Sequence, residues 1–153
     1  MARQPILTAL HAYLEAYNWQ TFSPEVYLGR SVFFPGSKDD PGPDPLPVLT
    51  VLPGQETAEH RYGGYDQITL DIGISAFISL DDGQDILEIC EPVFAEMKKA
   101  MFTGVLTVAT EQFTLQYTSG GILEYPPELG PFVAQIGVNA QLQYTTDHND
   151  TEE

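Results

Sequence analysis

The segments ITLDIGISAFISL (residues 68–80) and FVAQIGVNAQLQYT (residues 132–145) decide the fold of this chain. In each segment seven successive even-numbered positions carry apolar residues. Alternation with a period of two is typical of a β-strand that buries one face. Seven such positions span about 13 residues, or roughly 40 Å at about 3.3 Å per residue. These two strands are therefore expected to be about twice as long as ordinary strands.

The opposite faces of these two segments are polar but nearly uncharged. The odd positions from 67 to 79 include one charged residue, Asp71. The odd positions of the second segment include none; they are Val133, Gln135, Gly137, Asn139, Gln141, Gln143 and Thr145. Because the chain has many charged residues and keeps them off these faces, we expect large sheet surfaces that other chains cover. This pattern favours an assembly protein over an enzyme.

The length and composition indicate one globular domain over residues 1–146, followed by an acidic tail at 147–153 that we expect to be disordered. The chain has 153 residues, of which 42% are hydrophobic. No apolar run approaches the roughly 20 residues of a membrane span. A single cysteine, Cys90, excludes an intrachain disulfide framework and is expected to pack inertly on an apolar helix face. We therefore expect a protein that folds in a reducing cytoplasm.

The charge balance is strongly acidic, with 22 Asp and Glu residues against six Lys and Arg residues and a net charge of -16. The six cations are scattered along the chain: Arg3, Arg30, Lys38, Arg61, Lys98 and Lys99. Nucleic-acid binding depends on neutralising phosphates with Lys and Arg, so the chain should repel DNA, RNA and anionic membranes. The charge serves either solubility alone or a surface that nucleic acid passes without sticking.

The order of the predicted elements indicates an α+β fold with a mostly antiparallel sheet, two long strands and two main helices packed on one face. The first half of the chain is expected to form a helix from Pro5 that ends before Pro24, a strand over 25–34, a short strand over 48–51 and a long strand over 65–80. A second helix should run from an N-cap at Asp85 to a stop at Gly104, with a kink or restart at Pro92. A strand over 105–118 and the second long strand should follow.

Three connections are expected to be loops. Residues 35–47 hold five prolines and form either a mobile surface loop or a loop that orders against a neighbour. Residues 54–64 are predicted to be a polar connection. Residues 119–131 are predicted to be a long loop that exposes Ile122, Leu123 and Tyr125. Gly63-Gly64 and Gly120-Gly121 are interpreted as turn pairs rather than phosphate-binding loops.

The sequence gives little support for catalysis, a metal or a cofactor, and we expect none. His11, His60 and His148 are far apart, and there is no nucleophile elbow or Cys–His arrangement. Asp81, Asp82 and Asp85 could in principle bind Ca²⁺, but turn formation and helix capping explain them better. The acidic group Asp39, Asp40 and Asp44 is either a weak cation site or a solvated loop.

The layout resembles the tail terminator proteins of long-tailed bacteriophages, the group that includes the minor tail protein U of lambda-like phages. The resemblance covers residues 1–146 and rests on the order of the elements. Its most useful pieces are RYGGYDQITLDIGISAF at 61–77, the helix DILEICEPVFAEMKKAM and the final strand ending LQYTT. The density of proline over 35–47 is a departure that the resemblance does not explain.

The resemblance implies a structural virion protein that forms a hexameric ring and has no catalytic residues. Such a ring caps the tail tube, stops its polymerisation and presents the surface that joins the tail to the head. The implied partners are further copies of the chain, the tail tube protein and a head–tail connector or neck protein, with viral DNA passing through the centre unbound and no membrane involved. The implied location is the head-proximal end of the virion tail, with assembly in the host bacterial cytoplasm.

Ten residues are candidates for contacts with neighbouring chains, from the second long strand, the polar connection and the 119–131 segment: Gln135, Asn139, Gln141, Gln143, Arg61, Tyr62, Tyr65, Ile122, Leu123 and Tyr125. Three alternatives stay open beside the terminator: a head-completion or neck protein of the same virion, a monomeric binding module that uses the sheet face or the 119–131 loop, and a carboxylate enzyme with Ca²⁺.

Overall fold

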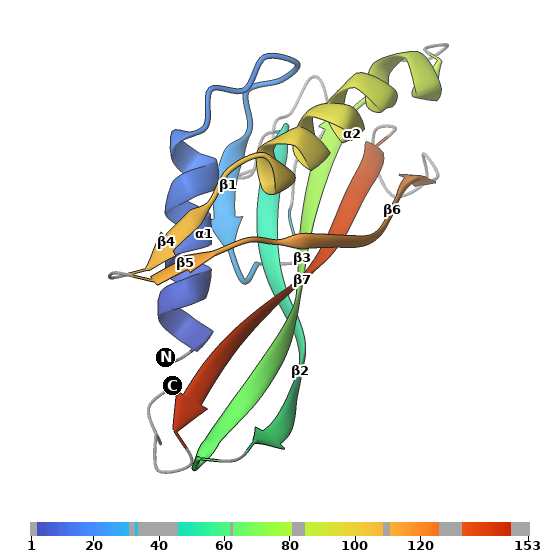
Figure 1. Ribbon diagram of the computed structural model, residues 1–153. Coiled ribbons are helices and arrows are strands. Elements are labelled where there is room, and N and C mark those ends of the chain that lie inside the picture. Colours follow the sequence, from blue (N-terminus) through green and yellow to red (C-terminus); the bar gives the residue numbers. More distant parts are fainter. Residues whose placement is uncertain are drawn as a thin grey trace.

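Two helices lie on one side of a five-stranded sheet in the computed structural model of the protein (Figure 1). The structure describes residues 3–30, 33, 46–61, 63–80, 85–108, 111–125 and 133–147. Most of the proline-rich segment 35–47 therefore lies outside the described residues, as do Tyr62, the turn 81–84 and residues 148–153. The α+β class predicted from the sequence is confirmed.

The strand order in the sheet is β1-β2-β3-β7-β6. Every pairing in it is antiparallel except β1 with β2. A separate antiparallel pair, β4 and β5, lies beside α1 (Figure 1). The elements are α1 (Arg3–Ala16), β1 (Glu25–Leu28), β2 (Val48–Arg61), β3 (Tyr65–Ser79), α2 (Ile86–Phe102), β4 (Leu106–Val108), β5 (Glu111–Phe113), β6 (Gln116–Tyr125) and β7 (Val133–Asp147).

The two long strands predicted from the alternation are β3 and β7, and each has 15 residues. They pair along their whole length, from Tyr65 opposite Asp147 to Ser79 opposite Val133. Their even-numbered residues share one face, so that Leu70 faces Leu142 and both are buried. The strand reaches Asp147, one residue into the segment that was expected to be a disordered tail.

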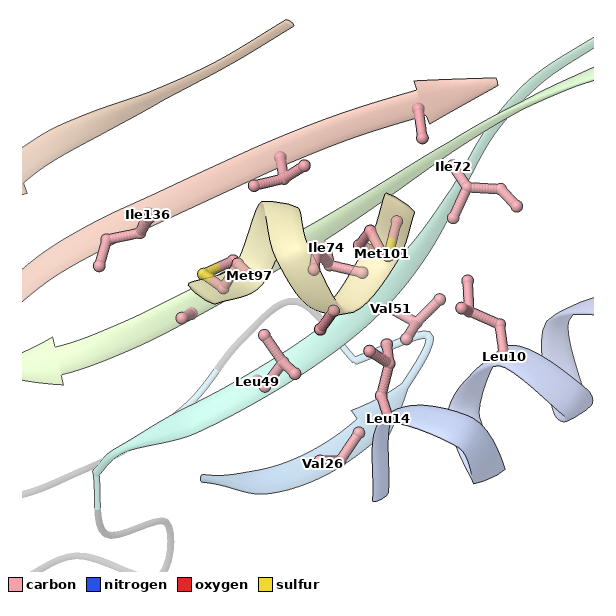
Figure 2. Close-up of a cluster of buried hydrophobic side chains, with 14 of the residues drawn as sticks. Leu10, Leu14, Val26, Leu49, Val51, Ile72, Ile74, Met97, Met101 and Ile136 are labelled. Atoms are coloured by element: carbon pink, nitrogen blue, oxygen red, sulfur yellow. The ribbon is translucent and has the colours of Figure 1, made fainter. Parts of the chain in front are cut away.

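The core lies between the even face of the long strands and the two helices (Figure 2). Leu10 and Leu14 of α1 and Met97 and Met101 of α2 are each at most 2% exposed. Cys90 is also buried on α2, as predicted. At about 25 cal/mol per Å² of apolar surface, this burial is the main term that holds the helices on the sheet.

Helix α2 begins as its sequence predicts, because the Asp85 side chain accepts a hydrogen bond from the Leu87 backbone N–H at 3.0 Å. The helix then runs through Pro92 to Phe102 without a restart. Gly104 follows the helix, and a Cβ at this position would lie 2.7 Å from the Tyr13 hydroxyl. This glycine therefore lets Tyr13 reach the Ala100 carbonyl, to which it donates at 2.8 Å.

The predicted connection over 54–64 was wrong, since β2 continues to Arg61 and forms a hairpin with β3. Gly63 and Gly64 make the turn with φ angles of 93° and 81°, a conformation that glycine adopts without strain. The outer half of β2 is exposed on both faces, so it carries no apolar alternation. Pro53 sits where the register breaks, a position where its missing N–H is tolerated.

The predictions over residues 105–131 were also wrong in part. The expected strand over 105–118 is three pieces, β4, β5 and the start of β6. The expected loop at 119–131 begins instead as strand, since β6 continues to Tyr125 and pairs with β7. Gly120 serves this pairing, because a Cβ there would lie 2.8 Å from both the Gly137 carbonyl oxygen and Phe94 Cε1. It is a close-approach glycine and not part of a turn.

Two further elements, α1 and β1, are shorter than expected. Helix α1 ends at Ala16, well before Pro24, and β1 has four residues instead of the ten expected over 25–34. The chain leaves β1 at Gly29, whose φ of 78° turns it out of the strand.

Candidate interaction surface

The face of the sheet opposite the helices is the candidate site, and we call it the open face. It consists of the odd-numbered residues of β3 and β7 with the residues of β2 and β6 that lie beside them. Within the 67–79 and 133–145 stretches, Asp71 is its one charged residue. Asn139 and Gln143 are exposed, and Gln135 and Gln141 are partly exposed. Side-chain amides therefore dominate this surface.

The amides of the open face are tied to neighbouring strands by hydrogen bonds. Gln141 donates to an Asp71 carboxylate oxygen at 2.9 Å, and the two residues are directly opposite in the register. The other bonds run from Asn139 to Ser119 Oγ at 3.0 Å, from Gln135 to Ser75 Oγ at 3.3 Å and from Gln67 to Gln143 Oε1 at 2.9 Å. These cross-strand bonds hold the amides in fixed directions, as an interface of defined geometry requires.

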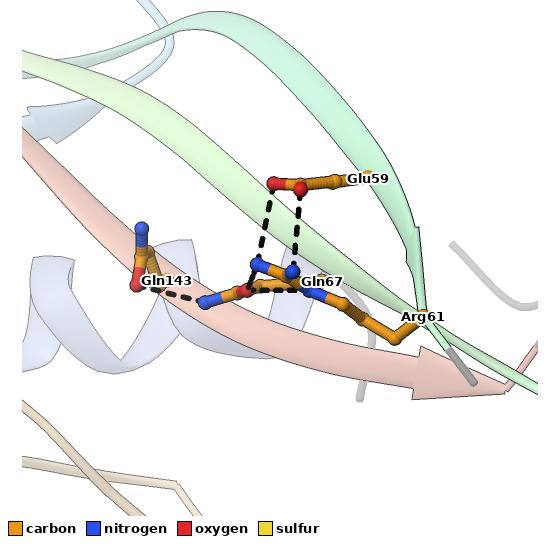
Figure 3. A network of polar contacts seen from close by, with 4 residues as sticks. All are labelled: Glu59, Arg61, Gln67 and Gln143. Atoms are coloured by element: carbon orange, nitrogen blue, oxygen red, sulfur yellow. Dashed lines mark hydrogen bonds and ion pairs between the residues drawn. The ribbon is translucent and has the colours of Figure 1, made fainter. Parts of the chain in front are cut away.

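The outer end of the open face carries a cluster around Arg61 (Figure 3). The Arg61 guanidinium contacts the Glu59 carboxylate at 3.2 Å and donates to Gln67 Oε1 through Nε at 3.1 Å. Gln67 in turn donates to Gln143, so the cluster crosses β2, β3 and β7. Both charged side chains are well exposed, so their ion pair contributes little stability. Its effect is to offset the one cation of this end with an acid.

Two shallow hollows lie on the open face. One has a volume of about 470 Å³ between β2, β3, β7 and β6, and Gly73 and Asn139 are among its lining residues. The second has a volume of about 330 Å³ over β6 and β7, and Gly121 and Gly137 are among its lining residues. The glycines leave the backbone bare between the long amide side chains. The surface is therefore uneven, with shallow depressions and no deep pocket at these two places.

Aromatic side chains cover the other end of the open face. The Phe33 ring lies 5.6 Å from the Phe77 ring and 5.2 Å from the Tyr27 ring. The Arg30 guanidinium stacks 4.9 Å from Phe33. Sequence reasoning missed this cover because residues 25–34 were interpreted as one strand, whereas the chain leaves β1 and crosses onto the open face.

The ten candidate contact residues fall into separate groups. Gln135, Asn139, Gln141 and Gln143 share the open face with Arg61, and the exposed Tyr65 stands at the start of β3. Leu123 is 62% exposed and lies opposite Gln135 on the open face. Tyr62 lies outside the described residues, and for Tyr125 the structure describes the strand backbone alone.

The expectation that Ile122 is exposed was wrong. Ile122 lies opposite Ile136 on the helix side of β6, where it is partly buried against the core. The strand alternation that continues through residues 119–123 turns it inward. Four polar residues of the open face were missed as candidates: Gln67, Asp71, Ser75 and Ser119. The strand register identifies them, since each of the four forms a hydrogen bond with an amide of β7.

The described residues show few features of a chemical site. Within them, no three His, Cys, Asp or Glu side chains gather as a metal site would require. Asp85 caps a helix, and Asp81 and Asp82 lie outside the described residues. None of the helices described is long and apolar enough to cross a membrane.

One carboxylate, that of Glu96, is buried and accepts several hydrogen bonds. It is 8% exposed on α2 and accepts hydrogen bonds from the Gln20 and Thr21 backbone N–H groups at 2.7 and 2.8 Å. Burial alone would raise the pKa of Glu96, but these bonds, the Thr21 hydroxyl and the nearby Lys99 outweigh it and leave the pKa below its usual value. A carboxylate held in this way ties α2 to the segment after α1, which is a structural role.

No protein-family model matches this chain, and no curated protein matches it either.

Proposed function

We propose that this protein is a bacteriophage tail terminator that assembles into a ring, with six subunits as the expected number. The ring caps the tail tube, ends its polymerisation and provides the head–tail joining surface. It has no catalytic residue and no cofactor. It acts at the head-proximal end of the virion tail, after assembly in the host bacterial cytoplasm.

The observation that carries this proposal is the open face. Both helices pack on one side of the sheet, and the other side presents hydrogen-bonded amides along β7 from Gln135 to Gln143. Leaving so large a surface with so few charges in water has no benefit for a chain with 28 charged residues, 22 acidic and six basic. Contact with further copies of the chain, the tube protein and a connector or neck protein gives this surface a use.

The charge supports the same proposal. A net charge of -16 repels the phosphates of DNA, so a ring of such subunits lets viral DNA pass without binding it. The like charges of neighbouring subunits also repel, so subunits should meet through neutral surfaces. Apart from Asp71 and Arg30, the open face is such a surface, with Arg61 and Glu59 offsetting each other at its end.

The first experiment is the mass of the purified protein by light scattering, with negative-stain images of the same sample. A closed ring supports the proposal, and six subunits per ring support it in full. If the protein is monomeric, the deciding measurement is growth of purified tail tubes with and without it. Tubes that lengthen unchanged in its presence would contradict a terminator and favour a neck protein or a monomeric binding module.

A further inference from the structure

The edges of the five-stranded sheet differ in how they are protected. An exposed edge strand offers unpaired N–H and C=O groups to any other strand, and proteins usually block such edges. At one side of the sheet, β1 is only four residues long. The Glu25 N–H donates to the Pro47 carbonyl and the Gly29 N–H to the Val51 carbonyl, so the backbone C=O of Val26 between them faces the edge, while its side chain lies in the core. The His11 ring N–H donates to the Val26 carbonyl at 3.1 Å and so blocks this edge.

The outer half of β2 extends beyond β1 and is blocked by other means. Pro53 has no N–H to donate, and the register shifts between Pro53 and Glu56. Charged residues then follow at Glu56, Glu59 and Arg61. Proline, bulges and charges are the usual devices against edge-to-edge pairing.

The edge at the other side of the sheet, β6, is protected less. Its register against β7 shifts between Tyr117 and Ser119, and the pairing is regular from Ser119 to Tyr125. The stretch QYTSGGIL has no charge and no proline. Ser119, Gly120 and Gly121 are exposed, as are Tyr117 at 46% and Leu123 at 62%. Among the described residues no strand lies beyond β6. Within the part of the chain that the structure describes, this edge is therefore unpaired and suited to pairing.

We propose that β6 pairs antiparallel with β6 of a second copy of this chain around a two-fold axis, which joins the two sheets into one. The choice of a second copy of this chain as the partner rests on the charge. Two chains of net charge -16 repel one another, so they can approach most closely where no charge stands, as along residues 118–123 of β6.

The register follows from the faces of β6. Ser119, Gly121 and Leu123 lie on the open face, while Gly120 and Ile122 lie on the helix face. An axis perpendicular to the sheet preserves these faces. Centred on Gly121, it places Gly121 opposite its own copy, each Leu123 opposite Ser119 and each Ile122 opposite Gly120. Within residues 119–123 the two large side chains, Leu123 and Ile122, then each face a small residue, which is complementary packing.

This contact goes beyond the proposed ring and does not depend on it. A two-fold contact uses the same patch on both subunits and cannot close a six-membered ring, which needs two different patches. It also leaves the central amides of β7 and the β2–β3 hairpin uncovered. The pair would therefore link two subunits outside the ring contact itself.

The register predicts a disulfide in a single variant, Gly121→Cys. Directly opposed residues in antiparallel strands have Cα atoms about 4.5–5.5 Å apart, which suits a disulfide. The matched control is Gly137→Cys, which lies opposite Gly121 on β7 and would be about 14 Å from its copy, three strand spacings. The native Cys90 is buried, so the wild type shows the background level of disulfide cross-linking. We expect mild oxidation to convert G121C, but not G137C or the wild type, into a covalent dimer.

A second set of variants tests the pairing without cross-linking. A Cβ at Gly121 or Gly137 meets no atom within 4 Å, so both sites accept larger side chains without disturbing the subunit. Gly121→Glu places two carboxylates opposite each other at the axis and should raise the dimer dissociation constant about tenfold. Gly121→Gln, which is neutral, and Thr8→Glu, which adds the same charge at an exposed position of α1, should dimerise as the wild type does in sedimentation at several concentrations.

The inference is overturned if G121C cross-links no faster than G137C, or if the wild type stays monomeric at all concentrations. Rings in which G121C does not cross-link would also overturn it while leaving the ring proposal intact. Cross-linked G121C dimers, with tubes that the protein fails to cap, would support the β6 contact and contradict the terminator.

Discussion

Glu96 on α2 accepts two hydrogen bonds from Thr21, one from the backbone N–H at 2.8 Å and one from the hydroxyl at 2.6 Å. A third bond comes from the Gln20 N–H at 2.7 Å. These bonds join two segments 75 residues apart in the chain. They fix the segment after α1 against α2, and so they help to position both helices on the sheet.

Replacing Glu96 by Gln should lower the free energy of unfolding by about 2 kcal/mol. Hydrogen bonds to a charged, buried acceptor are worth about 1.5–3 kcal/mol, and the neutral amide has one oxygen where the carboxylate has two. Urea unfolding followed by circular dichroism measures the change. The matched control is Glu91→Gln on the exposed side of the same helix, which should change stability by less than about 0.5 kcal/mol. Equal effects of the two variants would contradict the role of Glu96.

The stabilisation by Glu96 should depend on pH. The folded-state pKa of Glu96 lies below its usual value of 4.5, so the folded state holds this carboxylate ionised more firmly than the unfolded state does. Its contribution is present in full above the unfolded pKa and is lost as the pH falls through the folded pKa. The stability difference between wild type and E96Q should therefore be constant at neutral pH and shrink below about pH 4.5. A difference that stayed constant into strong acid would assign the effect to packing.

The neighbouring glycines 120 and 121 should respond in opposite ways to the same substitution. Gly120→Ala forces a Cβ to within 2.8 Å of a β7 carbonyl and of Phe94, and overpacking of this kind typically costs about 1–3 kcal/mol. Gly121→Ala meets nothing within 4 Å and has no positive φ, so it should be neutral or slightly stabilising, because alanine restricts the unfolded chain. Thermal melts of the two variants give the comparison, and a loss of stability in G121A alone would contradict the prediction.

The long strands could be predicted from the sequence because burial on one face leaves a period of two in the residues. β3 and β7 show it along most of their length, and the prediction of their bounds was wrong by one or two residues. The outer half of β2 shows no such period because neither of its faces is buried there. The hairpin was marked by its Gly63-Gly64 turn, but nothing in residues 55–61 indicated a strand.

The candidate surface was predictable in part for the same reason. The amides of β7 could be assigned to a shared face from spacing alone. Asp71 and Ser75 could be assigned to a face of β3 in the same way, but their pairing with the amides could not be predicted, since the register of β3 and β6 against β7 decides which side chains meet. Ser119 was placed in a loop, so its position on this face was not predicted. Ile122 was misplaced because Gly120-Gly121 was interpreted as a turn. The contact of Glu96 with Thr21 depends on tertiary packing and leaves no local pattern.

Replacing Gln141 by Lys should block assembly while leaving the subunit folded. Gln141 is partly exposed at the centre of the open face, and its amide already points at the Asp71 carboxylate. A lysine there can pair with Asp71, so the fold should tolerate it. It nevertheless puts a strongly hydrated ammonium group on a neutral contact surface, and burying this group costs several kcal/mol unless it is well paired.

The matched control for this variant is Thr8→Lys, which adds the same charge at an exposed position of α1, on the helix side of the sheet. Light scattering should show the wild-type assembly for T8K and no ring for Q141K, which should remain as single subunits or as pairs joined through β6, with equal circular dichroism spectra. Where assembly needs the tube, capping of purified tubes replaces mass as the measurement. If Q141K assembles or caps as well as T8K does, the centre of the open face is not a subunit contact. The ring would then have to form through the hairpin or another surface.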